Sequence, residues 1–419
     1  MAVEGFRARH AAVQLLGAVL SEGEMLSQLM TLPNGPMDAL PPSERARAQR
    51  LVTLTLRHLE QADRLLEPHV RRAPPRLVQN ALRLAVVEMA VDGAAAHGAV
   101  NAAVDIVRHG RKTAHQAGFA NAVLRSVSAE GVTFDGMPPQ RLPRWLRQPL
   151  VHAWGREAVA AIESVHASAP PVDLTLKSDA AAVPEGTALP TGSLRLDAGA
   201  QISALPGYET GDWWVQDAAA AMAVRLLAPK ADENIADFCA APGGKTMQLA
   251  DAGAKVTAID ISGPRLKRLS ANLTRTGLTA EVIATDVLTY AGGPFDAILL
   301  DAPCSASGTI RRHPDLPFVK TGEELATLVP LQAKLIDHAL TLLAPGGRLV
   351  FCTCSLFPEE GEGQLAAALE RHPDLRVLRP DMAGIDPAWI TEAGGLRLRP
   401  DLWADKGGMD GFFMVALTK

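Results

Sequence analysis

Short apolar runs alternate with amphipathic stretches from Asn234 to the end of the chain, and this alternation constrains the fold more than any other feature. Most of the amphipathic stretches have the residue spacing of helices, whereas the runs are too short to be helices. Strands that alternate with helices form a doubly wound α/β sheet, which we expect to be Rossmann-like. The predicted strands are 235–238, 256–260, 281–284, 297–301, 348–353 and 412–417.

The front of the chain has a different periodicity. Apolar residues recur there at spacings of three and four, as at Ala11 and Leu15, which is typical of helices that bury one face. Pairs of prolines separate successive helices, and the pair at 74–75 opens a helix that runs to Ala90. We therefore predict an all-α bundle for residues 1–130.

Two shorter regions lie between the bundle and the α/β sheet. Residues 131–149 are rich in proline and lose the helical period, which predicts a linker. Residues 150–210 are predicted to form a small α/β segment, with a helix over 150–166 followed by short strands. The doubly wound domain then occupies residues 211–419.

Charge and composition narrow the function classes. The net charge of −5 does not by itself indicate a nucleic-acid binder, but the first 130 residues are mildly basic, with 15 Lys and Arg against 12 Asp and Glu. No apolar run reaches the roughly 18 residues of a membrane helix, and residues 1–7 lack a secretory signal. We expect a cytoplasmic protein without membrane segments, whose four cysteines are reduced.

A Gly-rich turn follows the first predicted strand of the sheet. Residues 237–246 are Asp-Phe-Cys-Ala-Ala-Pro-Gly-Gly-Lys-Thr. Such a turn lets the backbone approach a cofactor closely at the strand ends. A phosphate-binding loop would have Gly at the position of Cys239, and Pro242 removes an N–H donor, so a P-loop nucleotidase is the weaker alternative.

Carboxylates follow the next two predicted strands. Asp260 ends the second strand, where it could accept hydrogen bonds from both hydroxyls of a ribose. Asp286 lies two residues beyond the third strand and could bind an adenine amino group. Either aspartate alone could equally be a helix cap or turn residue. Together with the Gly-rich turn, they favour S-adenosylmethionine as the cofactor.

Two cysteines follow the fourth and fifth predicted strands. Cys304 lies in Asp-Ala-Pro-Cys-Ser and Cys354 in Phe-Cys-Thr-Cys-Ser, so neighbouring strands would bring both to the cofactor end of the sheet. A thiolate adds readily to carbon 6 of a pyrimidine, which makes carbon 5 electron-rich and able to take a methyl group. Asp301 is a candidate for binding the amino edge and ring nitrogen of a cytosine. The residue types alone do not decide which cysteine attacks.

Structural explanations of the cysteines are the alternative. We expect Cys352 to be a small core residue, and Cys239 also fits a packing role. A zinc site would need Cys-x-x-Cys or Cys/His pairs that the chain does not contain. We therefore expect no bound metal.

These motifs resemble those of the bacterial RsmB (Sun-type) ribosomal RNA cytosine-C5 methyltransferases. Residues 239–246, 301–305 and 353–355 are similar to the family's cofactor loop and its two cysteine motifs, and 308–315 is similar to the stretch typical of this branch. Residues 117–125 resemble part of its NusB-like domain. The resemblance implies a multidomain α + α/β protein in which an all-α NusB-like RNA-binding bundle precedes a small α/β RNA-recognition segment and a Rossmann-like S-adenosylmethionine-dependent methyltransferase domain.

The resemblance also implies roles for individual residues. It makes Cys354 the nucleophile, while Cys304 assists product release. The implied activity is methyl transfer from S-adenosylmethionine to carbon 5 of a cytosine in small-subunit ribosomal RNA, through a covalent cysteine–cytosine intermediate. The alternative is an RNA-binding or antitermination module with a degenerate methyltransferase domain. The implied cofactor site consists of Cys239, Ala240, Ala241, Pro242, Gly243, Gly244, Lys245, Asp260, Asp286 and Asp301.

Clustered arginines are the expected contacts with RNA phosphates, although such clusters are as often a solvated surface. We expect the partner to be ribosomal RNA and the protein to be a monomer. The predicted contacts are Arg71, Arg72, Arg76, Arg311 and Arg312.

Overall fold

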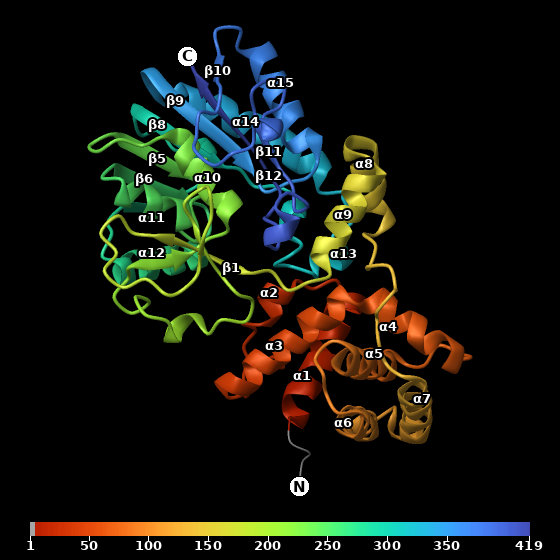
Figure 1. Cartoon of the computed structure of the whole chain (residues 1–419). Coiled ribbons are helices and arrows are strands. Elements are labelled where there is room, and N and C mark those ends of the chain that lie inside the picture. The colour runs from red at the N-terminus through yellow and green to blue at the C-terminus, as the bar shows by residue number, and fades with distance from the viewer. Residues whose placement is uncertain (1–4) are drawn as a thin grey trace. The chain divides into compact units, whose positions relative to one another are not determined.

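The computed structural model describes residues 5–419, and these divide into two compact units (Figure 1). The first four residues lie outside the described part. They belong to the range 1–130 predicted as a helical bundle and to residues 1–7, for which no secretory signal is predicted. The first unit contains the chain up to Val151 together with 155–169 and 312–321. The second contains 152–154, 170–311 and 322–419. Within residues 5–419, no helix is both long and apolar enough to cross a membrane.

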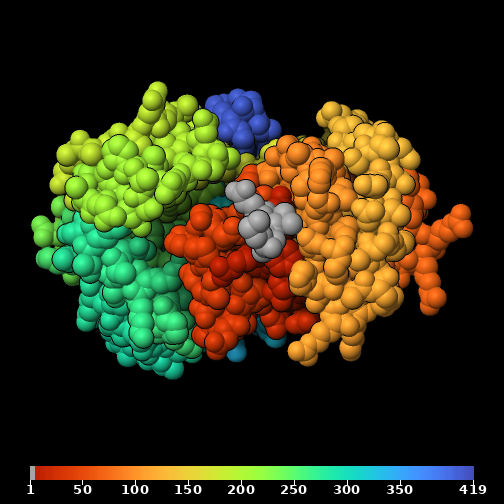
Figure 2. Space-filling view, turned by 90° about the horizontal axis from the view of Figure 1, so that it is seen from below, coloured from red at the N-terminus to blue at the C-terminus, as the bar shows by residue number. Residues whose placement is uncertain are grey.

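The first unit is built from helices, which confirms the predicted all-α bundle. Its core contains Leu15, Leu51, Leu82 and Leu124, all of which are buried. Figure 2 shows in red to orange the surface that this bundle presents on one side. The helices are α1 (Phe6–Gly17), α2 (Leu26–Leu29), α3 (Pro42–Arg57), α4 (Leu59–Leu66), α5 (Arg76–Ala90), α6 (Ala96–His109) and α7 (Ala117–Glu130).

A buried ion pair links α1 to α5 inside this bundle. The guanidinium of Arg9 lies 2.6 Å from the carboxylate of Glu88, and both side chains are almost fully buried. Arg47 of α3 adds a third charge at 3.2 Å from the same carboxylate. Because a buried carboxylate needs compensating partners, these contacts fix the three helices against one another.

The region predicted as a linker contains a helix. Helix α8 (Arg144–Trp154) begins inside the predicted linker, and Gly155, with φ 84°, separates it from α9 (Arg156–His166). The single helix expected over 150–166 is therefore wrong. Leu146 and Leu150, which are both fully buried, form an apolar face of α8. The prolines around them made this helical spacing hard to recognise in the sequence. The short helix α13 (Leu316–Val319) completes this unit.

A small antiparallel sheet opens the second unit. Its order is β2-β3-β1-β4, and Trp213 of β4 is fully buried in its core. The sheet therefore extends beyond the boundary predicted at residue 210, because the side chain of Trp213 packs with this sheet. The strands are β1 (Val172–Leu176), β2 (Thr187–Ala188), β3 (Leu194–Leu196) and β4 (Trp213–Val215).

A larger sheet follows, and it contains all six predicted strands. Its order is β10-β12-β9-β8-β5-β6-β7, with β11 paired to β12. Strands β5 to β9 are parallel to one another, whereas β12 is antiparallel to β9. The strands are β5 (Asn234–Phe238), β6 (Lys255–Asp260), β7 (Glu281–Ala284), β8 (Phe295–Asp301), β9 (Leu343–Thr353), β10 (Arg376–Leu378), β11 (Leu396–Leu398) and β12 (Phe412–Thr418).

Helices cover both faces of this sheet (Figure 1). Alternate side chains of β8 point to opposite faces: Leu299 shares a core with Met222, whereas Leu300 shares one with Leu335. Strand β5 lies between β6 and β8. The chain therefore passes from β5 toward β6 on one side, and from β8 toward β9 on the other side. Sheets of this kind bind ligands at the carboxyl ends of the strands at such a point. One face carries α10 (Ala218–Leu227), α11 (Gly244–Asp251) and α12 (Gly263–Thr276), and the other carries α14 (Leu325–Thr341) and α15 (Glu362–Arg371).

Candidate active site

The Gly-rich turn joins β5 to α11 at the carboxyl end of the sheet. Cys239 and Gly243 both have positive φ, at 61° and 104°. A Cβ on Gly243 would also lie only 2.8 Å from the side chain of Leu269 in α12. Glycine is therefore required at this position for its backbone conformation and for its small size. The result is a tight turn that leaves backbone close to any ligand bound there.

Asp260 connects this turn to the next strand. One oxygen of its buried carboxylate accepts the N–H of Ala241 at 3.1 Å and the other accepts the N–H of Ser262 at 2.8 Å. Arg265 lies 3.3 Å from the first oxygen. A carboxylate has about four acceptor sites, so these contacts leave capacity for a ligand. Asp286, beyond the neighbouring strand β7, accepts the N–H of Leu288 at 3.0 Å.

Asp237 is a site residue that the sequence did not single out. Its side chain is fully buried in β5, and one oxygen accepts the hydroxyl of Thr246 at 2.6 Å. Among the described residues the other oxygen, Oδ1, has no hydrogen-bond partner. Burial raises the pKa of this carboxyl to about 7. An unpaired buried carboxyl oxygen beside the turn is an acceptor that a polar ligand would satisfy.

Lys245 and Asp301 form an ion pair across the crevice between β5 and β8. The ammonium lies 2.7 Å from the carboxylate, and it also lies 5.3 Å from the centre of the Phe412 ring. Burial alone would lower the pKa of Lys245, but the charge and hydrogen bond of Asp301, together with the neighbouring Cys352 and Asp237, hold this pKa above its ordinary value. The lysine is therefore a fixed positive charge between the turn and the first cysteine motif.

Cys304 and Cys354 meet at the ends of β8 and β9, as the adjacency of the strands predicts. Their sulfur atoms are 3.4 Å apart and both residues are half-buried. The backbone N–H of Gly308 donates to the carbonyl of Cys354 at 3.0 Å, which holds the two loops together. The hydrogen bond with Cys354, together with burial, raises the pKa of the Cys304 thiol. The two sulfurs are within reach of the same reacting atom.

The other two cysteines have different surroundings. Cys352 is fully buried, as predicted, and its sulfur lies 3.5 Å from a carboxylate oxygen of Asp301. Burial raises the pKa of both Cys352 and Cys239. Neither thiol is therefore prepared for nucleophilic attack.

Glu360 links the two cysteine loops. Sequence reasoning missed this residue because Pro-Glu-Glu segments are usually exposed. Its carboxylate accepts the N–H of Ser305 at 2.9 and 3.2 Å and the side-chain amide of Gln332 at 2.9 Å. The hydroxyl of Thr353 donates to its carbonyl at 2.8 Å. Glu360 thus contacts the residue after Cys304 and the residue before Cys354.

Arg397 of β11 supports the second cysteine loop from the other side. Its guanidinium donates to the carbonyl of Ser355, the residue after Cys354, and pairs with Glu362. The same guanidinium lies 5.1 Å from the ring centres of Trp154 and Phe413. These contacts join segments far apart in the sequence, so no local pattern could have predicted them.

Arg311 is not the RNA contact that the sequence suggested. Its side chain is only 1% exposed, and its guanidinium lies 2.8 Å from Asp217 and 3.7 Å from Asp410. A buried guanidinium between two carboxylates is a structural cation, so the prediction for Arg311 is wrong. Arg312 is exposed, as are Arg71, Arg72 and Arg76 next to the start of α5.

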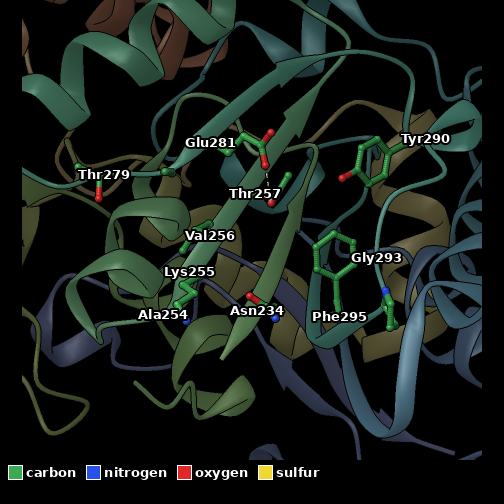
Figure 3. A pocket seen from close by; sticks show the side chains of 12 residues that line it. Asn234, Ala254, Lys255, Val256, Thr257, Thr279, Glu281, Tyr290, Gly293 and Phe295 are labelled. Carbon is green, nitrogen blue, oxygen red and sulfur yellow. Dashed lines mark hydrogen bonds between the residues drawn. The ribbon is translucent and has the colours of Figure 1, made fainter. Parts of the chain in front are cut away.

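A hollow of about 660 Å³ lies at the amino ends of β5 to β8, at the end of the large sheet opposite the cysteines (Figure 3). Asn234, Lys255 and Phe295 line it, and the hydroxyl of Thr257 donates to Glu281 at 3.2 Å. No predicted site residue lies there. In residues 5–419 no group of three or more His, Cys, Asp and Glu side chains could hold a metal ion.

The strand order, with a Gly-rich turn after β5, is that of a methyltransferase domain of the Rossmann-like class. The RsmB/F model of 16S rRNA methyltransferases matches residues 224–418, and the NusB family model matches 7–129. Ribosomal RNA small subunit methyltransferase B of Cronobacter sakazakii is 34% identical over 98% of this chain and 98% of its own, and that of Vibrio cholerae is 33% identical over 98% and 97%. The chain therefore belongs to the RsmB/F family of 16S rRNA methyltransferases, which confirms the resemblance.

A solved structure supports the same fold over the whole chain. The crystal structure of PH0851 matches with a TM-score of 0.75 and covers 100% of this chain and 99% of its own, at 22% identity. At this identity the likeness concerns the arrangement of helices and strands alone.

Proposed function

We propose that this protein transfers a methyl group from S-adenosylmethionine to carbon 5 of a cytosine in small-subunit ribosomal RNA. The observation that carries the proposal is the 3.4 Å separation of the Cys304 and Cys354 sulfurs beside the ligand-binding crevice. Membership of the RsmB/F family supports ribosomal RNA as the substrate. We place the activity in the cytoplasm, where thiols stay reduced.

The residues around the crevice fit a nucleoside cofactor. The turn of residues 239–245 would face its amino-acid part, Asp260 its ribose and Asp286 its adenine amino group. Ile261, which follows Asp260, is 73% exposed and would cover one face of the adenine ring. The unpaired Oδ1 of Asp237 would gain a donor. When bound, S-adenosylmethionine supplies an electrophilic methyl group.

Cys354 acts as the nucleophile in this proposal. Its thiolate forms a bond to carbon 6 of the cytosine, and the electrons of the carbon 5–carbon 6 double bond form the bond between carbon 5 and the methyl group, whose bond to the sulfonium sulfur of the cofactor would break to leave a neutral thioether. Carbon 5 then loses its proton to water, the double bond re-forms, and the carbon–sulfur bond breaks to return the thiolate. Cys304 assists this release, because a thiol at 3.4 Å can donate a hydrogen bond to the departing sulfur.

Asp301 and Lys245 would orient the base. The Asp301 side chain is 32% exposed, so its carboxylate can accept a hydrogen bond from the cytosine amino group while keeping its pair with Lys245. A cytosine inside a helical stack could not reach these groups, so the target base must leave its stack before attack.

The helical unit would provide the RNA contacts. Arg71, Arg72 and Arg76 are exposed side by side and can pair with phosphates, as can Arg312. The alternative function, an RNA-binding or antitermination module with a degenerate enzyme domain, is less well supported. A degenerate enzyme domain would not be expected to hold the thiols of Cys304 and Cys354 within hydrogen-bond distance, next to the ion pair of Lys245 and Asp301.

Parallel variants of the two cysteines test the proposal. Purified Cys304→Ala and Cys354→Ala proteins are incubated with small-subunit ribosomal RNA and S-adenosylmethionine, and RNA adducts are sought after denaturation. We expect neither to turn over and only Cys304→Ala to accumulate an adduct. An adduct in Cys354→Ala instead would reverse the two roles. Absence of methyl transfer by the unaltered protein on every ribosomal RNA would refute the proposal.

A further inference from the structure

Glu360 is a fully buried carboxylate without a cationic partner. Across residues 5–419 no Lys, Arg or His forms an ion pair with it, and its carboxylate contacts only N–H donors, from Ser305 and Gln332. Acceptance from N–H donors alone is the bonding pattern of an ionised carboxylate. Burying such a charge without a counter-ion is unfavourable, so its presence at this place calls for a role.

The contacts of Glu360 converge on Cys304. The N–H that both of its oxygens accept belongs to Ser305, the next residue. Gln332 donates to Glu360 and also to the carbonyl of Pro303, the preceding residue, at 2.8 Å. The peptide groups on both sides of Cys304 are therefore fixed through this one carboxylate.

The same residue holds the Cys354 loop. Its carbonyl accepts the hydroxyl of Thr353, directly before Cys354. The side-chain carboxylate, by contrast, contacts the Cys304 loop. The hydrogen bond with Cys354 and burial are the main causes that raise the pKa of the Cys304 thiol, and the charge of Glu360 adds to them. Glu360 thus contacts the Cys304 loop through its charged side chain and the Cys354 loop only through its main-chain carbonyl, although the two sulfurs are in contact.

We propose that Glu360 is a positioning residue that makes the two cysteines inequivalent, because it fixes the separation of their loops and places its carboxylate against the Cys304 loop, which keeps Cys304 a neutral thiol. A neutral Cys304 can donate a hydrogen bond to the leaving sulfur, whereas a second thiolate could not. Only this catalytic consequence rests on the proposed function. The inequivalence of the thiols is a property of the free protein and is measured without RNA.

Alkylation by iodoacetamide measures this inequivalence, because only thiolates react quickly. The rate at each cysteine is followed between about pH 6 and pH 10 by mass spectrometry of sequenced peptides. We expect Cys304 to react more slowly than Cys354 at every pH. Glu360→Gln should raise the rate at Cys304 by about tenfold at a given pH, which corresponds to one pH unit in its profile.

Two further variants separate charge from structure. The adjacent Glu359 is exposed, so Glu359→Gln is the matched control and should leave both profiles unchanged. Glu360→Asp keeps the charge and should keep Cys304 slow. An unchanged Cys304 profile in folded Glu360→Gln would overturn the proposal. If Glu360→Gln does not fold, equal profiles for the two cysteines in the unaltered protein would overturn it, and slow Cys304 alkylation in both that protein and Glu360→Asp would support it.

The test also distinguishes this inference from the proposed function. Different thiol profiles in a protein that methylates no RNA would leave the inequivalence standing and refute the activity. Methyl transfer to RNA by a protein whose two cysteines have equal alkylation profiles would support the activity and refute the inequivalence.

Discussion

The ammonium of Lys245 lies 2.7 Å from the carboxylate of Asp301, which joins the Gly-rich turn to the first cysteine motif. The pair lies at the carboxyl ends of β5 and β8, the two strands that flank the crevice. One contact therefore couples the part of the sheet that would hold the cofactor to the part that would hold the base.

Lys245→Met should disrupt this coupling. The substitution keeps most of the apolar stem but leaves Asp301 without its cation, so we expect a loss of about 1–2 kcal/mol in the free energy of unfolding by urea. The value is modest because Asp301 is partly exposed. The exposed pair of Lys255 and Asp232 provides a control, since Lys255→Met should change stability by less than about 0.5 kcal/mol. Equal effects of the two substitutions would contradict the prediction.

Asp237 should make stability depend on pH. Burial raises its pKa from 3.8 to about 7, so the folded protein binds more protons than the unfolded chain between these values. The contribution of this carboxyl to the free energy of unfolding must therefore fall as the pH rises from about 4 to 7. Asp237→Asn cannot titrate, so its stability measured by urea unfolding relative to the unaltered protein should increase across this interval. A constant difference between the two proteins would exclude the predicted titration.

Arg311→Ala should act on stability and not directly on RNA. Removal of the guanidinium takes away the cation that the buried carboxylates of Asp217 and Asp410 share, and breaking a buried ion pair usually costs about 3–5 kcal/mol. Thermal unfolding should show a strongly lowered Tm. The exposed Arg268 is a suitable control, and Arg268→Ala should leave the Tm nearly unchanged. A stable Arg311→Ala protein with weakened RNA binding would restore the original interpretation of this residue.

The cluster of Arg71, Arg72 and Arg76 should contribute to RNA affinity through counterion release. Replacing all three by Ala should reduce the slope of log affinity against log salt concentration by about two to three. Filter binding at several salt concentrations measures this slope. The control replaces Arg108, Arg111 and Lys112, three exposed cations of the same unit. A change of slope in the control alone would place the RNA-binding surface there instead.

The larger sheet could be predicted from sequence because its central strands are buried on both faces and therefore consist of apolar runs with polar ends. Strands β10 and β11 were missed, since three residues show no period. Helix α8 was missed because its prolines obscured Leu146 and Leu150.

The predicted meeting of Cys304 and Cys354 needed only the adjacency of two strands. Glu360 and Arg397 could not be found in this way, since their partners are distant in sequence and their burial depends on the completed fold. Arg311 was misjudged for the same reason: consecutive arginines are usually exposed, and only the fold brings Asp217 and Asp410 to this one.

The loop that carries Cys304 is held at both ends, by Glu360 at Ser305 and by two carboxylates at Arg311. A thiol on so firmly anchored a loop has little freedom to search for its target. In the proposed reaction the moving partner would then be the nucleic acid, and discrimination between cytosines would depend on which base can leave its stack and reach the two sulfur atoms.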